Sequence, residues 1–394
     1  MNHKLTSLLT LTALLTLTAC GPQRQVESAP TPAPLNAITY NGEQLYLSGF
    51  NLAWIDFAWD FGQGVHEKEL RKALEKLVAD GGNTLRWWVH TDGSMTPEWG
   101  DVDGKRLVTG PGGSFIEDLR KGLDIADEYG VYLVPSLWSF DMLKCNDHRT
   151  PPNAANATLL NNDEVLQSYI DKVLTPLVSE LNKHPRLIAW ELFNEPENMT
   201  EQWLPEQSTG FWHWDENTKK SSYVECKVPF RGPFPTMEQL QRTQAKMAAA
   251  IHRIALQNNE NALVTTGSKS MGKYNSDVAG GYNWYQDDRM IAAADGDALA
   301  VLDFYEPHYY NNESKDGAWS PFHHHASYWQ VDKPIVIGEF HPHPLDVLDD
   351  PLEVSQLCSR LQDLGYAGGW AWHWADGEKA QHEMEICLKS VKTK

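Results

Sequence analysis

The sequence predicts an α/β fold of the (β/α)8 barrel class, in which eight parallel strands alternate with eight helices. Short apolar runs alternate eight times with helical segments after residue 36, and such alternation is typical of a parallel sheet. Two of the runs, residues 187–193 and 334–340, lead into a glutamate, at the strand end where barrels place their polar site residues. An open doubly wound sheet is the alternative, but no GxGxxG motif follows the first strand.

Residues 1–19 have the features of a bacterial lipoprotein signal peptide. Lys4 gives a positive start, and residues 5–17 form an apolar, threonine-rich run too short to span a bilayer comfortably. Leu17-Thr18-Ala19-Cys20 then resembles a lipobox, which implies that Cys20 is lipidated. Gly21 is similar to the residue that sorts lipoproteins to the outer membrane of Gram-negative bacteria. An ordinary secretory signal cut after Ala19 is the alternative.

The next segment contains little apolar surface. Residues 20–35 are rich in Pro, Ala, Ser and Gln, so we expect a tether there and the folded barrel domain in residues 36–394. The formal net charge of −20 disfavours nucleic acid and polyanionic substrates. A neutral substrate is therefore expected.

The first half of the barrel is defined by apolar periodicity and by helix-end signals. Gly81-Gly82 ends the first helix, and Ser114 with Glu117 predicts a capping box for the second. The expected elements are strand 45–52, helix 67–79 with Leu70, Leu74, Leu77 and Val78 on its buried face, strand 83–89, a helix carrying Leu119, Leu123 and Ala126, strand 131–137, and helix 163–181.

The second half begins with the strand at 187–193 and a long loop at 197–235. Thr236 and Gln239 predict another capping box. The remaining expected elements are a helix to about residue 256, strand 262–266, a short helix near Arg289, strand 299–305, a weak helix near Tyr328, strand 335–339, helix 351–364, strand 368–374, and helix 378–391.

Four cysteines follow the lipobox and are free to pair in an oxidising compartment. We favour Cys145 with Cys226, in long loops, and Cys358 with Cys387, on successive helices; four free thiols are the alternative. The histidine runs at 323–325 and 341–343 lack HExxH spacing, and no CxxC occurs, so neither a metal nor a cofactor is expected.

Two acids at strand ends supply what cleavage of a glycosidic bond requires: one protonated acid at the leaving oxygen and one ionised carboxylate at the anomeric carbon. Asn194-Glu195-Pro196 and Gly338-Glu339-Phe340, on the fourth and seventh strands, resemble clan A of the glycoside hydrolases, and most of all family five. The resemblance implies that Glu195 is the acid/base and Glu339 the nucleophile of a retaining reaction. Two structural, ion-paired or capping glutamates are the alternative.

The second strand contributes further candidates. Alternation sends Arg86, Trp88 and His90 the same way, and an inward Arg86 would keep Glu339 ionised. The family has an arginine in that role. Structural pairing of Arg86 with Glu191 is the alternative, and both can hold.

Substrate contacts are implied by the same resemblance. Asn194 is similar to the family's asparagine at the sugar 2-hydroxyl. Tyr310 is similar to the tyrosine that donates to the nucleophile, and His308 to the histidine near the acid/base. Trp372, with Trp374 second, is similar to the tryptophan that floors the cleaved sugar's subsite.

One departure from the family lies at the end of the third strand, where members usually carry a histidine. This chain has Trp138 there, and His90 is the other candidate to replace it. Trp54 follows the first strand and is a candidate for sugar stacking, with a hydrophobic cluster as the alternative. Further tryptophans in loops have the same two interpretations: Trp59, Trp203, Trp212 and Trp214.

These observations predict an exported, lipid-anchored, monomeric retaining glycosidase without a cofactor. It would act on a neutral β-1,4-linked glycan, with mannan favoured over glucan on general likeness, and would contact membranes only through its anchor. The alternatives are a cellulase or β-glucanase, an exo-β-glycosidase, a non-catalytic glycan-binding lipoprotein and a metal-dependent barrel hydrolase.

Overall fold

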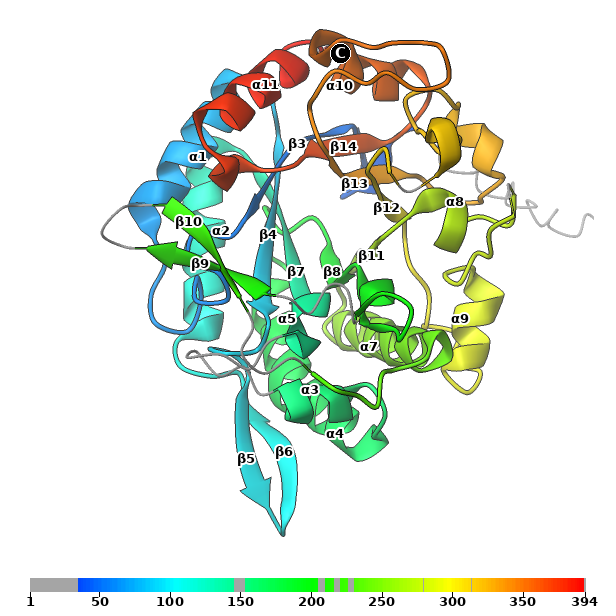
Figure 1. Ribbon diagram of the computed structural model, residues 1–394. Coiled ribbons are helices and arrows are strands. Elements are labelled where there is room, and N and C mark those ends of the chain that lie inside the picture. Colours follow the sequence, from blue (N-terminus) through cyan, green and yellow to red (C-terminus); the bar gives the residue numbers. More distant parts are fainter. Residues whose placement is uncertain are drawn as a thin grey trace, which may run out of the picture. The chain divides into compact units, whose positions relative to one another are not determined.

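A closed barrel of eight parallel strands forms the centre of the protein (Figure 1). This computed structural model describes residues 35–144, 153–204, 210–215, 220–225, 230–278, 280–312 and 314–392. In order round the barrel, the strands are β3 (Leu47–Ala53), β4 (Thr84–Thr91), β7 (Tyr132–Ser139), β8 (Trp190–Asn194), β11 (Val264–Ser268), β12 (Glu306–Tyr309), β13 (Val336–Phe340) and β14 (Gly368–Ala371). The predicted (β/α)8 fold class is confirmed.

Helices surround the barrel (Figure 1). They are α1 (Glu67–Ala79), α2 (Phe115–Tyr129), α3 (Asn153–Leu159), α4 (Asp163–Tyr169), α5 (Thr175–Leu181), α7 (Met237–Gln257), α8 (Met271–Tyr274), α9 (Asp287–Ala293), α10 (Val354–Asp363) and α11 (Glu378–Leu388). A π-helical segment, Ile170–Leu174, joins α4 to α5, so the helix predicted at 163–181 is present. Within the described ranges, none of the helices has the length and apolar character needed to cross a membrane.

Three small hairpins lie outside the barrel sheet, and the sequence analysis missed all of them. They are β1 (Ile38–Tyr40) with β2 (Glu43–Leu45), β5 (Glu98–Val102) with β6 (Lys105–Gly110), and β9 (Gly210–Asp215) with β10 (Lys220–Glu225). The β5–β6 hairpin projects from the body of the molecule (Figure 1). Its turn, Asp103-Gly104, has positive φ at both residues, and Asp-Gly is a common two-residue hairpin turn. The long loop predicted at 197–235 contains the β9–β10 hairpin.

The interior of the barrel changes character along its axis. Near the amino ends of the strands it is apolar, and the β1–β2 hairpin packs against it through Ile38, Tyr40 and Leu45. The buried residues of this layer are Leu47, Val134, Ile188, Ala189, Phe304, Val336, Ala367 and Trp370. Toward the carboxyl ends, buried charged side chains replace the apolar ones. The fold therefore gathers its charged interior at one end.

The helix-end predictions had mixed outcomes. The capping box of Thr236 and Gln239 is confirmed by its two reciprocal hydrogen bonds, 3.3 and 2.9 Å long. The one predicted at Ser114 is wrong, because the Ser114 hydroxyl donates to the Asp118 carboxylate at 2.7 Å instead of accepting a backbone N–H. Val78 is 44% exposed and does not belong to the buried face of α1.

The sixth barrel strand lies later than predicted. Residues 299–305 form turns and one isolated bridge, and the Asp303 carboxylate accepts hydrogen bonds from Val264 N and His252 there. The barrel strand is β12, which begins at Glu306. His308 consequently lies within the strand rather than beyond its end.

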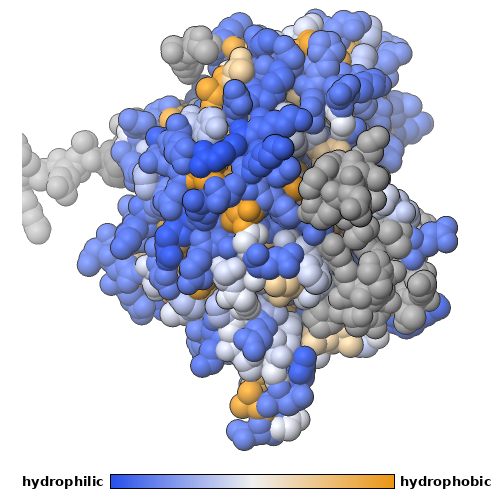
Figure 2. Space-filling model, turned by 90° about the vertical axis from the view of Figure 1, so that its left-hand side faces the viewer, coloured by the Kyte–Doolittle hydropathy of each residue, from blue (hydrophilic) through white to orange (hydrophobic). Residues whose placement is uncertain are grey.

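The disulfide predicted between Cys358 and Cys387 is present and joins α10 to α11. The predicted partners Cys145 and Cys226 lie outside the described residues, as does Cys20. On the face drawn in Figure 2, hydrophilic residues predominate and hydrophobic residues form small separate patches.

Candidate active site

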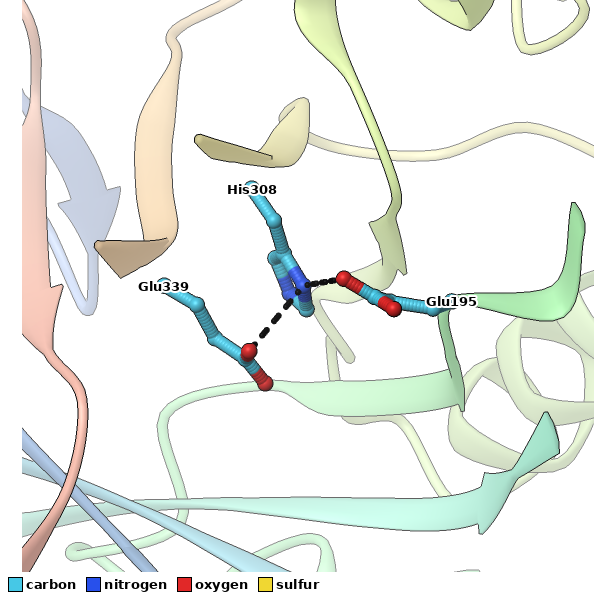
Figure 3. Close-up of side chains that lie close together, drawn as sticks. All are labelled: Glu195, His308 and Glu339. Atoms are coloured by element: carbon cyan, nitrogen blue, oxygen red, sulfur yellow. Dashed lines mark hydrogen bonds and ion pairs between the residues drawn. The ribbon is translucent and has the colours of Figure 1, made fainter. Parts of the chain in front are cut away.

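Glu195 and Glu339 meet at the carboxyl ends of the strands, on either side of His308 (Figure 3). Glu195 directly follows β8, and Glu339 lies in β13. His308 Nδ1 lies 3.0 Å from Glu195 Oε1 and 3.4 Å from Glu339 Oε2. Carboxylate oxygens of the two glutamates lie within 4.8 Å of each other. Retaining glycosidases separate their two carboxyl groups by about 5–5.5 Å, so the geometry fits that chemistry.

Glu339 is held by two donors. Arg86 Nη1 donates to Oε1 at 2.6 Å, and the Tyr310 hydroxyl donates to Oε2 at 2.7 Å. Arg86 also donates to both oxygens of Glu191 at 2.6 Å, so it makes both of the contacts considered for it, to Glu339 and to Glu191. These contacts stabilise an ionised Glu339.

Glu195 lies in a different backbone setting. Its φ of +46° is in the left-handed region, and its N–H donates to the Gly267 carbonyl at 2.6 Å. The side chain accepts hydrogen bonds from the Asn198 amide and from His308 Nδ1, when that nitrogen is protonated. None of these partner groups carries a permanent positive charge, whereas the guanidinium that contacts Glu339 does.

Longer-range charge acts on both acids. At Glu195, burial raises the pKa, but Lys269, His308 and Arg86 outweigh it and lower the pKa to about 2. At Glu339, burial and the charge of Glu195 raise the pKa, against His308, Arg86 and Tyr310. Groups this close titrate as a pair and share a proton. We place that proton by direct contact: Glu339 is the better-held anion because a guanidinium touches it.

Asn194 lies beneath the two acids. Its Oδ1 accepts from Arg86 Nη2 at 2.8 Å, and its Nδ2 donates to the Ser139 hydroxyl at 3.3 Å. Asn194 therefore connects the arginine to the end of β7 and is itself fixed in orientation.

An aromatic cluster lies at the ends of β3, β4 and β14. Trp54 packs against Trp88 and Trp372, with ring centroids 5.1 and 5.9 Å apart. Trp372 is half-buried, whereas Trp54 and Trp88 are only 3% and 5% exposed. Trp372 is therefore the member of the cluster with the most surface left to meet a ligand.

Trp374 points elsewhere. Its ring stacks on Phe50 with centroids 5.2 Å apart, and Lys72 of α1 lies over it. This position is in the layer between barrel and helices, so Trp374 is not brought to the site.

His90 and Trp138 are also directed away from the two glutamates. The pairing register of β4 with β7 shifts between Trp88 and Thr91, so simple alternation fails at His90. Its ring nitrogens pair with the hydroxyls of Thr96 and Tyr169, at 2.7 and 3.1 Å, and its ring packs on Trp138. Burial lowers the pKa of His90 to about 3, so it stays neutral. Neither residue replaces the family's third-strand histidine.

Two more buried acids, Glu191 and Glu306, surround Arg86, and the sequence analysis missed Glu306. Arg86 Nε lies 3.1 Å from Glu306 Oε1. The missed signal was periodicity, because Glu306 is two residues before His308 and a strand points both side chains the same way. Lys269, which follows β11, was also missed.

Trp203 lies near Lys269, which directly follows β11. Lys269 and Lys273 place their ammonium groups 4.9 and 4.6 Å from the centroid of its ring. Its Nε1 donates to the Tyr274 hydroxyl at 2.9 Å. The side chains of Trp212 and Trp214 lie outside the described residues.

One group of side chains in the described part of the chain is close enough to hold a metal ion: Glu195, His308 and Glu339 themselves. His308 Nδ1 pairs with Glu195 Oε1 at 3.0 Å and lies 3.4 Å from Glu339 Oε2. The histidine runs at 323–325 and 341–343 do not form such a group, and His341 packs edge-on against Tyr310 with ring centroids 4.8 Å apart.

Comparison with known proteins agrees with this geometry. Residues 39–367 match the family described as Cellulase (glycosyl hydrolase family 5). The chain is 30% identical over 342 residues to a mannan endo-1,4-beta-mannosidase of Mytilus edulis, which covers 86% of each protein. It is equally similar, at 30% over 345 residues, to the enzyme of that name from Cryptopygus antarcticus, covering 86% of this chain and 82% of the relative.

A solved structure shows the same arrangement of elements. The beta-1,4-mannanase from the sea hare Aplysia kurodai superposes with a TM-score of 0.70 at 29% identity, covering 90% of this chain and 94% of that one. The family match over residues 39–367 includes both strand ends that carry Glu195 and Glu339.

Proposed function

The chain belongs to glycosyl hydrolase family 5, and on that premise we propose that it hydrolyses β-1,4-linked mannan with retention of configuration, by double displacement. The observation that carries the chemistry is the pair of carboxyl groups within 4.8 Å of each other at the barrel mouth. The choice of mannan rests on the relatives, two of which are named as mannan endo-1,4-beta-mannosidases at 30% identity.

In the first step, the Glu339 carboxylate attacks the anomeric carbon while the bond from that carbon to the leaving oxygen breaks. Glu195 gives its proton to the leaving oxygen. Arg86 and Tyr310 hold Glu339 ionised and aimed, which is why the shared proton is assigned to Glu195.

In the second step, water enters where the leaving group was. Glu195, now a carboxylate, takes a proton from the water as its oxygen bonds to the anomeric carbon, and the bond to Glu339 breaks. His308 lies between the two acids and orients Glu195 in both steps. Asn194 binds the sugar 2-hydroxyl, and Trp372 stacks under the cleaved sugar.

A substrate screen tests this function. The full chain is incubated with linear mannan, glucomannan, cellulose, mixed-linkage glucan and xylan, and product lengths are resolved. We expect release of manno-oligosaccharides, with a mixture of lengths early in the reaction. Release from cellulose or mixed-linkage glucan but not mannan would support a glucanase, monosaccharide alone an exo-enzyme, and binding without any cleavage a glycan-binding protein.

We further propose that residues 1–19 are a signal peptide, residues 20–35 a tether and residues 36–394 the catalytic domain, and that the protein is a monomer held at the outer membrane by a lipid on Cys20. Support comes from the lipobox-like sequence and Gly21. Expression in a Gram-negative host with a labelled fatty acid tests this. Label should appear in the full chain and be lost in Cys20→Ala; equal labelling would refute the anchor. Light scattering reports the oligomeric state.

A further inference from the structure

Glu306 lies at the start of β12, fully buried beneath the catalytic pair. Glycines on the neighbouring strands make room for it. A Cβ at Gly338 would lie 2.8 Å from both Cγ and Oε1 of Glu306, and one at Gly267 would lie 2.5 Å from Glu191 Oε1. The barrel thus leaves space at two positions for a compact cluster of polar side chains.

The charges in this cluster do not balance. Arg86 contributes one positive charge, and three buried carboxyl groups contact its guanidinium: Glu191, Glu306 and Glu339. Buried charge without a partner is costly, and such a group usually neutralises by taking up a proton. At least one of these acids is therefore expected to be protonated in the folded protein.

The contacts indicate which one. Glu191 receives two hydrogen bonds from Arg86 and one from the Ser136 hydroxyl, at 2.8 Å. Glu339 accepts one hydrogen bond from Arg86 and one from the Tyr310 hydroxyl. Glu306 has only the edge of the guanidinium at 3.1 Å, and no well-aligned donor from the described residues reaches either of its oxygens. It is the poorest site for a negative charge and the best site for the proton.

The groups facing Glu306 support the same choice. They are Arg86 from β4, Glu191 from β8, His308 from β12 and Glu339 from β13. Burial raises the pKa of Glu306 well above its ordinary value, and the negative charge of Glu191 raises it further. Both carboxyl groups approach Arg86 Nε, Glu191 at 2.6 Å and Glu306 at 3.1 Å, so they are neighbours and a protonated Glu306 has an acceptor in Glu191.

We propose that Glu306 is a positioning residue held as a neutral carboxylic acid, which donates to Glu191 and so leaves the charge of Arg86 for Glu191 and Glu339. This inference rests on the proposed function for its consequence in turnover. If Glu306 loses its proton, three carboxylates share the single positive charge of Arg86. The guanidinium then stabilises the ionised form of Glu339 less strongly.

Thermal unfolding tests the protonation state without any reference to activity. A buried acid with a raised pKa keeps its proton in the folded state after the unfolded chain has lost it. The wild type should therefore lose stability as pH rises above about 4.5, until Glu306 itself ionises. Glu306→Gln reproduces the size and neutrality of the acid but cannot titrate. The Tm of Glu306→Gln minus that of the wild type should therefore increase as the pH is raised from about 5.

Two further variants serve as controls. Glu75→Gln, on the exposed face of α1, should show a constant Tm difference. Glu306→Asp keeps a carboxyl group and should follow the pH trend of the wild type. A constant difference for Glu306→Gln would show that Glu306 is ionised and overturn the proposal. Failure of Glu306→Gln to fold would do the same, because an amide satisfies the proposed contact.

Kinetics then test the link to Glu339. Replacing a neutral acid removes no charge, so the acid limb of the kcat/KM profile should move by less than about 0.3 pH unit in Glu306→Gln. Replacing an ionised acid would move it down by about one unit. Glu306→Ala, which leaves a space beside Arg86, should lose about tenfold or more in kcat/KM. If the protein has no glycosidase activity, the proposed function fails, but the thermal measurement still tests the protonation state of Glu306.

Discussion

The ends of β8 and β13 hold their glutamates in contrasting ways. Glu339 lies in extended backbone within a strand, and a guanidinium and a phenol bind its two oxygens. Glu195 lies one residue past its strand, with a φ of +46°, and takes its hydrogen bonds from an amide and an imidazole. A non-glycine residue in the left-handed region costs about 1–2 kcal/mol, so the fold accepts strain at one acid and none at the other.

This contrast suits the two roles. A nucleophile must stay ionised and aimed, and permanent positive charge at fixed distance does that. An acid/base must gain and lose a proton in each cycle, and partners that are neutral or can change protonation allow it. The following predictions test whether the two strand ends are really unequal.

Removing each carboxylate should have the largest effect. Glu339→Ala abolishes the covalent step, so kcat should fall by about 10⁴-fold or more on every substrate. In Glu195→Ala, kcat on mannan should fall by about 10²–10⁴-fold. The rate of the first step should fall much less on an aryl glycoside, because its leaving group needs no proton. Steady-state and burst kinetics on both substrates measure the difference.

Azide supplies the control for this pair. It should rescue Glu195→Ala with a product of retained configuration and Glu339→Ala with an inverted one, because it attacks the glycosyl-enzyme in the first case and the substrate in the second. Unfolding curves would verify that both variants are folded. Substantial wild-type activity in either variant would remove the mechanism.

Tyr310→Phe tests the donors at the β13 end. The phenol favours the ionised form of Glu339, so its loss should raise the pKa of that carboxyl and move the acid limb of kcat/KM to higher pH. At the optimum, kcat should fall by about ten- to a hundredfold. The profile is measured on a manno-oligosaccharide of fixed length. An unmoved acid limb would mean that Tyr310 does not control Glu339.

The features that could be predicted from the sequence are those that follow from regular strands and helices. Eight apolar runs predicted the barrel, and alternation predicted that Arg86 points inward. The pairing of Cys358 with Cys387 followed from their places on the last two helices. Each of these inferences needed only a local period or a position within an element.

What could not be predicted depends on departures from that period. The register shift in β4 turns His90 toward Tyr169, and a fixed alternation cannot anticipate it. The late start of β12 concealed Glu306, because residues 299–305 are apolar enough to pass for the strand. Glu195's left-handed backbone is likewise set by tertiary contacts.

Lys269→Met tests the β8 end with a smaller effect. The lysine charge lowers the pKa of Glu195, so its removal should raise that pKa. Because Glu195 must be protonated to act as the acid, activity should persist to higher pH, with the alkaline limb moving up by less than about one unit. Lys273→Met, also over the Trp203 ring, is the matched control. Equal shifts in both would indicate a general charge effect rather than one specific to Lys269.

Removal of divalent metal ions with a chelator should not change the activity. This result would distinguish a site that works by proton transfer from one that needs a bound metal. Glu195, His308 and Glu339 are spaced closely enough to bind a divalent ion, yet His308 Nδ1 is already hydrogen-bonded to Glu195 and lies 3.4 Å from Glu339. Activity should be unchanged after dialysis against a chelator, because proton transfer and covalent attack need only the two carboxyl groups. Added zinc should inhibit by competing with substrate for those same atoms. Activity that is lost on chelation and restored by the metal would instead support a metal-dependent hydrolase.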